Sequence, residues 1–198
     1  DRAFCVGADV YAWSQLTPFD FARHWVREGH RILDRLARLS KPTIAVISGH
    51  AFGGGLELTA ACDVRLMSPS ATLAMPETGV GIVPGWSGTQ RLVRQMPASV
   101  VKELVLFGRR LSAERARQIG FIAEVDNDPR ARALTFAADL TTKSPRATEI
   151  AKYMLGAALG ENTETMIEAL GGGMMASSED KTEGINAFRE KRPPNFNE

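Results

Sequence analysis

The first strong pattern along the chain is that of an amphipathic helix. Apolar residues recur at helical spacing from Phe19 to Leu39, with Arg and Asp between them, and Ser40-Lys41-Pro42 ends the pattern. The β-branched run at residues 43–48 then predicts a buried strand. A glycine-rich turn at residues 49–55 leads from this strand into a short apolar helix at residues 56–62.

Shorter strands and helices follow in alternation as far as residue 128. We expect strands over residues 63–68, 72–75 and 121–125. Helices are expected from a cap at Ser87 or Thr89 to Met96, over residues 98–107, and from Ser112 to just before Gly120.

Beyond residue 128 the pattern is helical only, with long amphipathic segments from Ala131 to Arg189. Interruptions are expected near Ser144-Pro145, Gly160 and Gly171 to Gly173. The change from alternating elements to helices predicts an α/β core over residues 1–128 and a helical region over residues 129–198.

The composition is that of an ordinary globular protein. The 198 residues are 44% hydrophobic and 24% charged, which argues against disorder. A net charge of +1 gives no reason to expect nucleic acid as a partner, and no apolar run approaches the ~20 residues of a membrane helix. Cys5 and Cys62 are too few for a disulfide framework and are not spaced as metal ligands, so we predict no metal site.

The start of the chain has neither an initiator Met nor a signal-peptide pattern. We expect a truncated or processed start and a cytoplasmic protein, and targeting to an organelle stays open.

A glycine turn followed by a glutamate is the first sign of chemistry. Gly53, Gly54 and Gly55 let a ligand approach backbone N–H groups closely, which suits stabilisation of an oxyanion. The alternative is a tight turn that needs glycine for its own geometry. Glu57 follows on a helix with almost no polar face, so we expect a buried carboxylate with a raised pKa. The alternative there is an exposed glutamate in a first helical turn.

A second carboxylate, Glu77, follows Pro76 on an irregular segment that contains Gly79, Gly81 and Gly85. Such a segment is suited to presenting backbone groups to a ligand, although an ordinary loop carboxylate is an equally open interpretation. Two buried carboxylates that face one cavity would hold a water between them, one accepting a proton and the other supplying one.

The segment around Gly7 and Ala8 offers a second backbone donor, which gains weight only if it lies beside Gly54. Three histidines carry weaker signals. We expect His50, next to the glycine turn, to be hydrogen-bonded in place, and His24 and His30 to lie on the polar side of their helix without a role.

At these residues the chain resembles the crotonase (enoyl-CoA hydratase/isomerase) superfamily, and the resemblance runs through nearly its whole length. The segments that carry it are FCVGAD (residues 4–9), GHAFGGGLE (49–57), ACD (61–63), PE (76–77), GIVPGWSGTQRL (81–92) and EGINAFREKR (183–192). Any one of these segments is a weak signal, whereas their order and spacing together are specific.

The resemblance implies a spiral of ββα units with a C-terminal helical trimerisation region, assembled as a homotrimer or a dimer of trimers. It implies an acyl-CoA substrate of the kind used in fatty acid metabolism. No cofactor is expected beyond the coenzyme A that forms part of the substrate, and no metal, nucleic acid or membrane.

The same resemblance assigns roles to particular residues. The thioester oxygen is expected in an oxyanion hole between the N–H groups of Ala8 and Gly54. Glu57 and Glu77 match the paired carboxylates of the hydratases, in which Glu77 would chiefly exchange the α-carbon proton and Glu57 would activate the water. Residues expected to contact substrate are Gly53, Gly85, Trp86 and, in the C-terminal helix, Phe188 and Lys191, which match positions that reach a neighbouring subunit's CoA site in relatives.

Three departures from the family pattern bear on this prediction of a 2-enoyl-CoA hydratase. The chain starts near the first oxyanion segment, Trp86 stands where a small residue is common, and Gly171 to Gly173 interrupt a region that is usually helical. Trp86 keeps an enoyl-CoA isomerase, another acyl-CoA dehydratase and a decarboxylase open as alternatives. The expected truncation keeps open a non-catalytic acyl-CoA-binding subunit.

Overall fold

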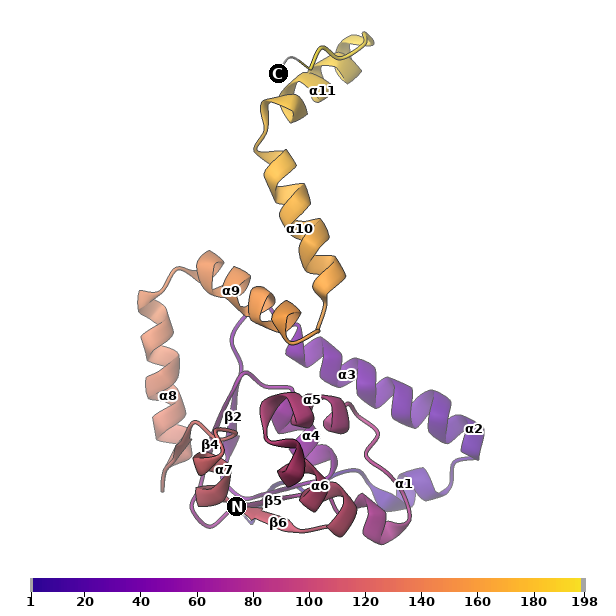
Figure 1. Ribbon diagram of the computed structural model, residues 1–198, viewed down its shortest axis with the longest axis vertical. Coiled ribbons are helices and arrows are strands. Elements are labelled where there is room, and N and C mark those ends of the chain that lie inside the picture. The colour runs from indigo at the N-terminus through magenta and orange to yellow at the C-terminus, as the bar shows by residue number, and fades with distance from the viewer. Residues whose placement is uncertain (1, 197–198) are drawn as a thin grey trace. The chain divides into compact units, whose positions relative to one another are not determined.

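The computed structural model describes residues 2–196, and the chain divides into two compact units after residue 149. The first unit holds all the strands found in the described part of the chain (Figure 1). They are β1 (Ala3–Cys5), β2 (Ile44–Ile47), β3 (His50–Phe52), β4 (Val64–Met67), β5 (Thr72–Ala74), β6 (Arg110–Ser112) and β7 (Glu124–Val125).

These strands form two sheets. One has the order β1-β3-β5-β6, with β5 and β6 antiparallel and the other neighbours parallel. The other sheet has the order β2-β4-β7 and is parallel throughout. Parallel strands are usually covered on both faces, which agrees with the apolar, β-branched sequence of β2.

Helices connect and cover the strands. In the first unit they are α1 (Val10–Ser14), α2 (Pro18–Asp20), a π-helical segment (Phe21–Val26), α3 (Arg27–Ala37), α4 (Gly54–Ala60), a 3-10 turn (Glu77–Val80), α5 (Gly88–Gln95), α6 (Ala98–Phe107), α7 (Ala113–Gln118), α8 (Pro129–Asp139) and a second 3-10 turn (Leu140–Thr142). Helix α9 (Pro145–Ala158) crosses the division between the units, and α10 (Thr163–Ala176) and α11 (Glu179–Glu190) belong to the second unit.

Several helices begin where their sequence predicts. Ser112 accepts a hydrogen bond from the Arg115 N–H at the start of α7, and Asp128 accepts one from the Ala131 N–H at the start of α8. Each side chain satisfies a backbone donor that has no partner within its own helix.

The core of the first unit is built from both sheets and from helices α4, α5 and α6, which are labelled in Figure 1. Its fully buried members include Ile47, Leu56, Leu73, Leu104 and Phe121. Helix α4 contacts β1, β3 and α5, so the segment that carries Glu57 is held from several sides.

Three expectations about local structure are corrected. Residues 50–52 form strand β3 within the predicted glycine turn, and residues 110–112 form strand β6, which the pattern did not indicate. The predicted interruption at Gly171 to Gly173 is wrong, because α10 continues through all three residues. Glycine lowers helix propensity by ~1 kcal/mol without removing a backbone hydrogen-bonding group, so the helix tolerates it.

The helical region was expected to begin at residue 129. Helix α8 contacts both β2 and β4, which ties residues 129–139 to the α/β core, and the first unit extends to residue 149. No helix within residues 2–196 combines the length and apolarity that crossing a membrane requires.

Candidate active site

The three glycines at the start of α4, Gly53 to Gly55, each satisfy a different steric requirement. Gly53 has a φ of 53° and a ψ of −123°, a conformation that residues with a Cβ rarely adopt. A Cβ on Gly54 would lie 2.8 Å from the Trp86 ring, and one on Gly55 would lie 2.0 Å from the carbonyl oxygen of Cys5. Close packing therefore explains part of the glycine run, since Gly55 fits α4 against β1.

The two expected backbone donors lie beside the same pocket. A Cβ on Gly7, whose φ is 100°, would lie 3.5 Å from the amide nitrogen of Gly54. Within residues 2–196, neither the Ala8 N–H nor the Gly54 N–H donates a hydrogen bond to another group. Asp9 has an ordinary capping role, because its Oδ1 accepts from the Tyr11 and Ala12 N–H groups. Two donors are thus available to a ligand oxygen.

Glu57 is buried, as its apolar neighbours predicted, with 3% of its surface exposed. Its Oε1 accepts hydrogen bonds from the Trp86 N–H at 2.8 Å and the Gly88 N–H at 2.9 Å. Burial raises the pKa of Glu57, while these two hydrogen bonds and the nearby His30 and Arg91 oppose that rise. The surroundings of Glu57 therefore contain several groups that favour its ionised form.

Glu77 is buried in a different environment. Its Oε1 lies over Gly53, where a Cβ would approach it to 2.7 Å, and within residues 2–196 its Oε2 has no hydrogen-bond partner. Burial raises the pKa of Glu77; a hydrogen bond from its own backbone opposes this, and the negative charge of Glu57 adds to it. The surroundings of Glu77 thus favour its protonated form.

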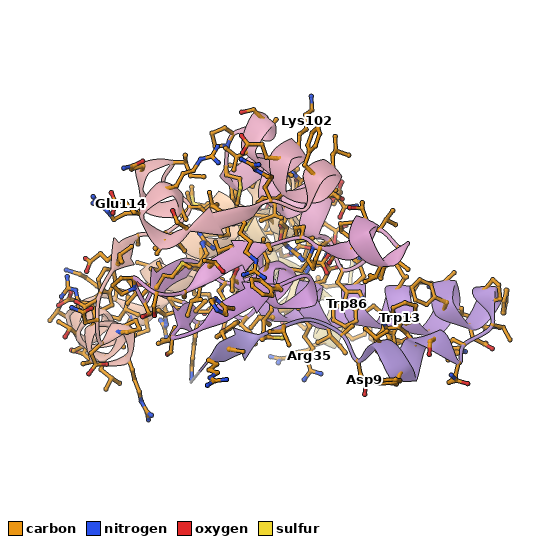
Figure 2. The ribbon with its side chains drawn as sticks, turned by 90° about the horizontal axis from the view of Figure 1, so that it is seen from below. Asp9, Trp13, Arg35, Trp86, Lys102 and Glu114 are labelled. Carbon is orange, nitrogen blue, oxygen red and sulfur yellow. The ribbon has the colours of Figure 1, made fainter. Side chains whose placement is uncertain are left out.

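Both carboxylates and both amides line one pocket with a volume of about 160 Å³. Glu57 and Glu77 are the only charged side chains among its described lining residues, and the rest of the wall is apolar, aromatic or glycine. Trp13 and Trp86, labelled in Figure 2, both belong to this wall. Gly53 and Gly85 line it as well, so the pocket gathers most of the residues expected to contact substrate.

Trp86 is fixed by the long helix of the first unit. Its Nε1 donates to the carbonyl oxygen of Trp25 at 3.1 Å, and the two rings lie 5.6 Å apart at an angle of 42°. Trp25 belongs to the π-helical segment, a feature that is frequent near functional sites. Gly29 makes room for the indole, since a Cβ there would lie 2.1 Å from Nε1. Its only signal in the sequence is a glycine inside an amphipathic helix.

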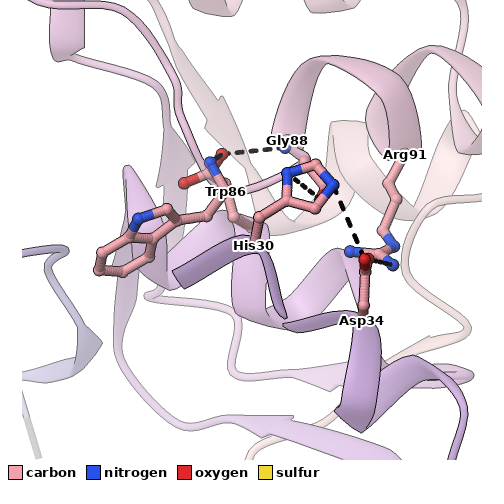
Figure 3. A network of polar contacts seen from close by, with 7 residues as sticks. His30, Asp34, Trp86, Gly88 and Arg91 are labelled. Atoms are coloured by element: carbon pink, nitrogen blue, oxygen red, sulfur yellow. Dashed lines mark hydrogen bonds and ion pairs between the residues drawn. The ribbon is translucent and has the colours of Figure 1, made fainter. Parts of the chain in front are cut away.

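His30 corrects the sequence analysis, which gave it no role. It reaches Ser87, whose hydroxyl lies 2.9 Å from Nε2 and 3.0 Å from Nδ1 of the imidazole. Asp34 lies 3.8 Å from His30 and accepts a hydrogen bond of 2.7 Å from Arg91, which completes the network in Figure 3. His24 is exposed on the same helix, as expected.

His50 is hydrogen-bonded in place, as predicted, because its Nδ1 lies 3.2 Å from the Thr72 N–H nitrogen and 3.0 Å from the Thr72 hydroxyl. Phe188 and Lys191 lie at the end of α11 in the second unit, where Phe188 is 84% exposed. Their expected contact with a neighbouring subunit's CoA stays a prediction.

The chain is similar to known proteins along its length. A family model described as enoyl-CoA hydratase/isomerase matches residues 1–198. The "Putative enoyl-CoA hydratase/isomerase YngF" of Bacillus subtilis is 38% identical over 97% of this chain and 75% of its own length. "Methylglutaconyl-CoA hydratase, mitochondrial" of Mus musculus is 35% identical over 98% of this chain and 64% of its own length. The chain thus spans about two thirds to three quarters of these relatives.

A solved structure has the same architecture. The enoyl-CoA hydratase of Bacillus anthracis superposes with a TM-score of 0.77 at 33% identity, covering 98% of this chain and 77% of the other. The expected α/β fold with a helical C-terminal region is thereby confirmed.

Proposed function

The chain belongs to the enoyl-CoA hydratase/isomerase family, and we propose that it catalyses the reversible addition of water to a 2-enoyl-CoA thioester. The product is the 3-hydroxyacyl-CoA. The observation that carries this proposal is that Glu57 and Glu77 converge on one apolar pocket, together with the N–H groups of Ala8 and Gly54.

The two amides stabilise the negative charge of the reaction. With the thioester oxygen between Ala8 and Gly54, their N–H groups donate hydrogen bonds to it. These hydrogen bonds stabilise the enolate that forms as water adds to the β-carbon. Removing one donor of this kind typically costs ~3 kcal/mol of transition-state stabilisation. Because neither N–H is occupied within the described chain, no internal hydrogen bond has to break first.

The two acids divide the proton transfers. The water oxygen bonds to the β-carbon while one of its protons passes to Glu57, and Glu77 delivers a proton to the α-carbon. A proton then returns from Glu57 to Glu77 through solvent, which completes the cycle. The supporting geometry is that two backbone N–H groups favour Glu57 as the carboxylate, while burial without a partner on Oε2 favours Glu77 as the acid. Because Glu57 and Glu77 interact, their apparent pKa values belong to the pair and not to either residue alone.

This addition transfers no electrons and breaks no bond that a metal must polarise, so the proposal includes neither a redox cofactor nor a resident metal. Dialysis against a chelator should leave the rate unchanged.

The direct test follows the loss of absorbance of the conjugated thioester with crotonyl-CoA and longer 2-enoyl-CoA esters. Glu57→Gln and Glu77→Gln should each lower kcat by at least the ~10²-fold that a positioned acid–base group contributes. Lys102→Ala is a suitable control, because Lys102 is exposed on α6 and lies well away from Trp86 (Figure 2).

A rate that either glutamine variant leaves intact would remove that residue from the mechanism. Conversion of a 3-enoyl-CoA to the 2-enoyl isomer without hydration would favour the isomerase alternative. Binding of CoA esters without turnover would favour a non-catalytic role.

The pocket wall also bears on which acyl group is accepted. Its described lining contains no Lys or Arg, and both of its charges are acidic, so a second carboxylate on the substrate would be buried without a partner. We therefore expect neutral 2-enoyl groups to be preferred over 3-methylglutaconyl-CoA, the kind of ester named for one relative. A kcat/KM for 3-methylglutaconyl-CoA at least ~10-fold below that for crotonyl-CoA would support this preference. Equal values would contradict it.

A further inference from the structure

We propose that His30 is a positioning residue for Glu57: its hydrogen bond to Ser87 holds the turn whose two amides grip the Glu57 carboxylate. The kinetic part of this inference rests on the proposed function, whereas the geometry does not.

The turn from Trp86 to Gly88 has one unusual residue at its centre. The N–H groups on either side of Ser87, those of Trp86 and Gly88, donate to the same oxygen of Glu57. Ser87 itself has a φ of 72° and a ψ of 8°, the left-handed conformation that residues with a Cβ avoid. It caps no helix N–H with its side chain. Some other interaction must therefore offset the cost of this conformation.

That interaction comes from His30. The Ser87 hydroxyl is buried with its residue, which is 6% exposed, and lies within hydrogen-bond distance of the imidazole. Trp86, at the start of the turn, is fixed by the hydrogen bond from its indole to the carbonyl oxygen of Trp25. Because Gly29 has no side chain, it leaves room for the indole ring in this position. Trp25 and His30 thus hold the turn at two points.

The charged groups around His30 come from several elements. Asp34 lies on the same helix, 3.8 Å away, and accepts a hydrogen bond from Arg91 of α5. Glu57 of α4 is near enough to His30 for the charge of the imidazole to lower the pKa of Glu57. Glu57 also accepts a hydrogen bond from Trp86, which precedes α5. A direct effect of imidazole charge on Glu57 is therefore the rival explanation that the test must separate.

Loss of the hydroxyl–imidazole hydrogen bond should let Ser87 relax and turn the two N–H groups away from Glu57. Those donors favour the carboxylate, so without them the pKa of Glu57 rises further. At a given pH below that raised pKa a smaller fraction of Glu57 is ionised, so the acid limb of the kcat profile moves to higher pH. Because neither residue lines the described pocket wall, KM for substrate should change little.

Two substitutions at Ser87 separate the hydroxyl from the backbone conformation. Ser87→Ala removes the hydroxyl and keeps the unfavourable φ, whereas Ser87→Gly removes both the hydroxyl and the cost of that φ. We expect His30→Ala and Ser87→Ala each to lower kcat by about ten-fold, the effect of one lost hydrogen bond. Ser87→Gly should lose clearly less than Ser87→Ala, and His30→Gln, which keeps an amide donor, should lose less than His30→Ala.

The decisive variant combines His30→Ala with Ser87→Gly. If His30 acts through the conformation of Ser87, adding His30→Ala to Ser87→Gly should lower kcat only slightly. Glycine adopts that conformation without the hydrogen bond from His30. An undiminished loss in the Ser87→Gly background would overturn the proposal in favour of a direct charge effect. His24→Ala is the matched control, since His24 is exposed on the same continuous helix, where it lies 3.7 Å from Asp20.

A second readout needs no turnover. Glutamate labelled with ¹³C at its side-chain carboxyl allows the titration of Glu57 to be followed by NMR, with Glu57→Gln as the assignment control. His30→Ala and Ser87→Ala should raise the pKa of Glu57, and Ser87→Gly should raise it less. Should the protein hydrate no enoyl-CoA, the proposed function fails while this titration still tests the role of His30. An unchanged Glu57 titration in both variants, with folding verified by circular dichroism, would refute it.

Discussion

At the scale of single residues, the pair of buried acids shows how surroundings separate two chemically similar groups. Glu57 accepts two backbone hydrogen bonds, whereas Oε2 of Glu77 has no partner within the described residues and experiences the charge of Glu57. A general base and a general acid require this difference. The difference arises from which backbone N–H groups point at each carboxylate, so it belongs to the folded chain.

The burial of Glu77 makes the stability of the folded chain depend on pH. The pKa of Glu77 is raised above its ordinary value of 4.5 by burial, so the unfolded chain ionises before the folded one as pH increases. Stability should therefore be greatest below about pH 4.5 for this group and fall as pH rises through the raised pKa. We expect Glu77→Gln to flatten that fall and to be more stable than the parent at pH 7. Urea unfolding between pH 4 and 8 measures this, and parallel curves would contradict it.

At the scale of elements, the sequence predicted those with a long pattern or a clear signal at their ends. Helix α6 begins and ends as expected, and β2 and α4 lie within two residues of their expected bounds. Strands β3 and β6 have three residues each, too few for a period to be recognised, and their pairing partner is the distant β5. Their existence depends on contacts across the fold.

The residues of the candidate site likewise divide into those with a local signal in the sequence and those without one. Glycine runs and apolar neighbours indicated Gly54 and Glu57, because those signals are local, whereas the donor at Ala8 gains weight only from the position of Gly7 beside Gly54 in the fold. The contact between His30 and Ser87 was missed, since Ser87 comes 57 residues later and only the packing of α3 near α5 brings the two together.

Replacing glycine by alanine should have opposite effects on stability in two of the helices. Gly29→Ala should lower stability by ~1–3 kcal/mol, because its Cβ would collide with the Trp86 indole, although alanine is the better helix former by ~1 kcal/mol. Gly172→Ala in α10 meets nothing within 4 Å and should raise stability by ~0.5–1 kcal/mol. Denaturant unfolding of both variants measures these values.

A double variant tests the cause. Trp86→Ala should relieve much of the loss caused by Gly29→Ala, because the two groups compete for one space. Strictly additive losses would show that Gly29 is needed for another reason.

At the scale of the whole molecule, the second unit presents apolar side chains that a soluble chain rarely leaves uncovered. Ile167, Leu170 and Met174 share one face of α10 and are exposed by 65%, 48% and 74%. We propose that other copies of this chain cover this face, in line with the trimer or dimer of trimers expected from the family resemblance.

Light scattering coupled to gel filtration should find three or six copies of the chain in the particle. Leu170→Glu combined with Met174→Glu should shift the particle to a smaller size, because two charges would be buried at the contact. A monomeric parent protein, or an unchanged size in the double variant, would contradict this assembly.

The Trp86–Gly88 turn has an evolutionary implication. Trp86 forms part of the pocket wall, and the N–H groups of Trp86 and Gly88 donate to the Glu57 carboxylate. A mutation that widens substrate range by replacing the indole would also release the anchor on Trp25 and disturb reactivity. Selection for new substrates would thus meet a trade-off here, and adaptive changes should arise in pairs, with the second in the helix that carries Gly29 and His30.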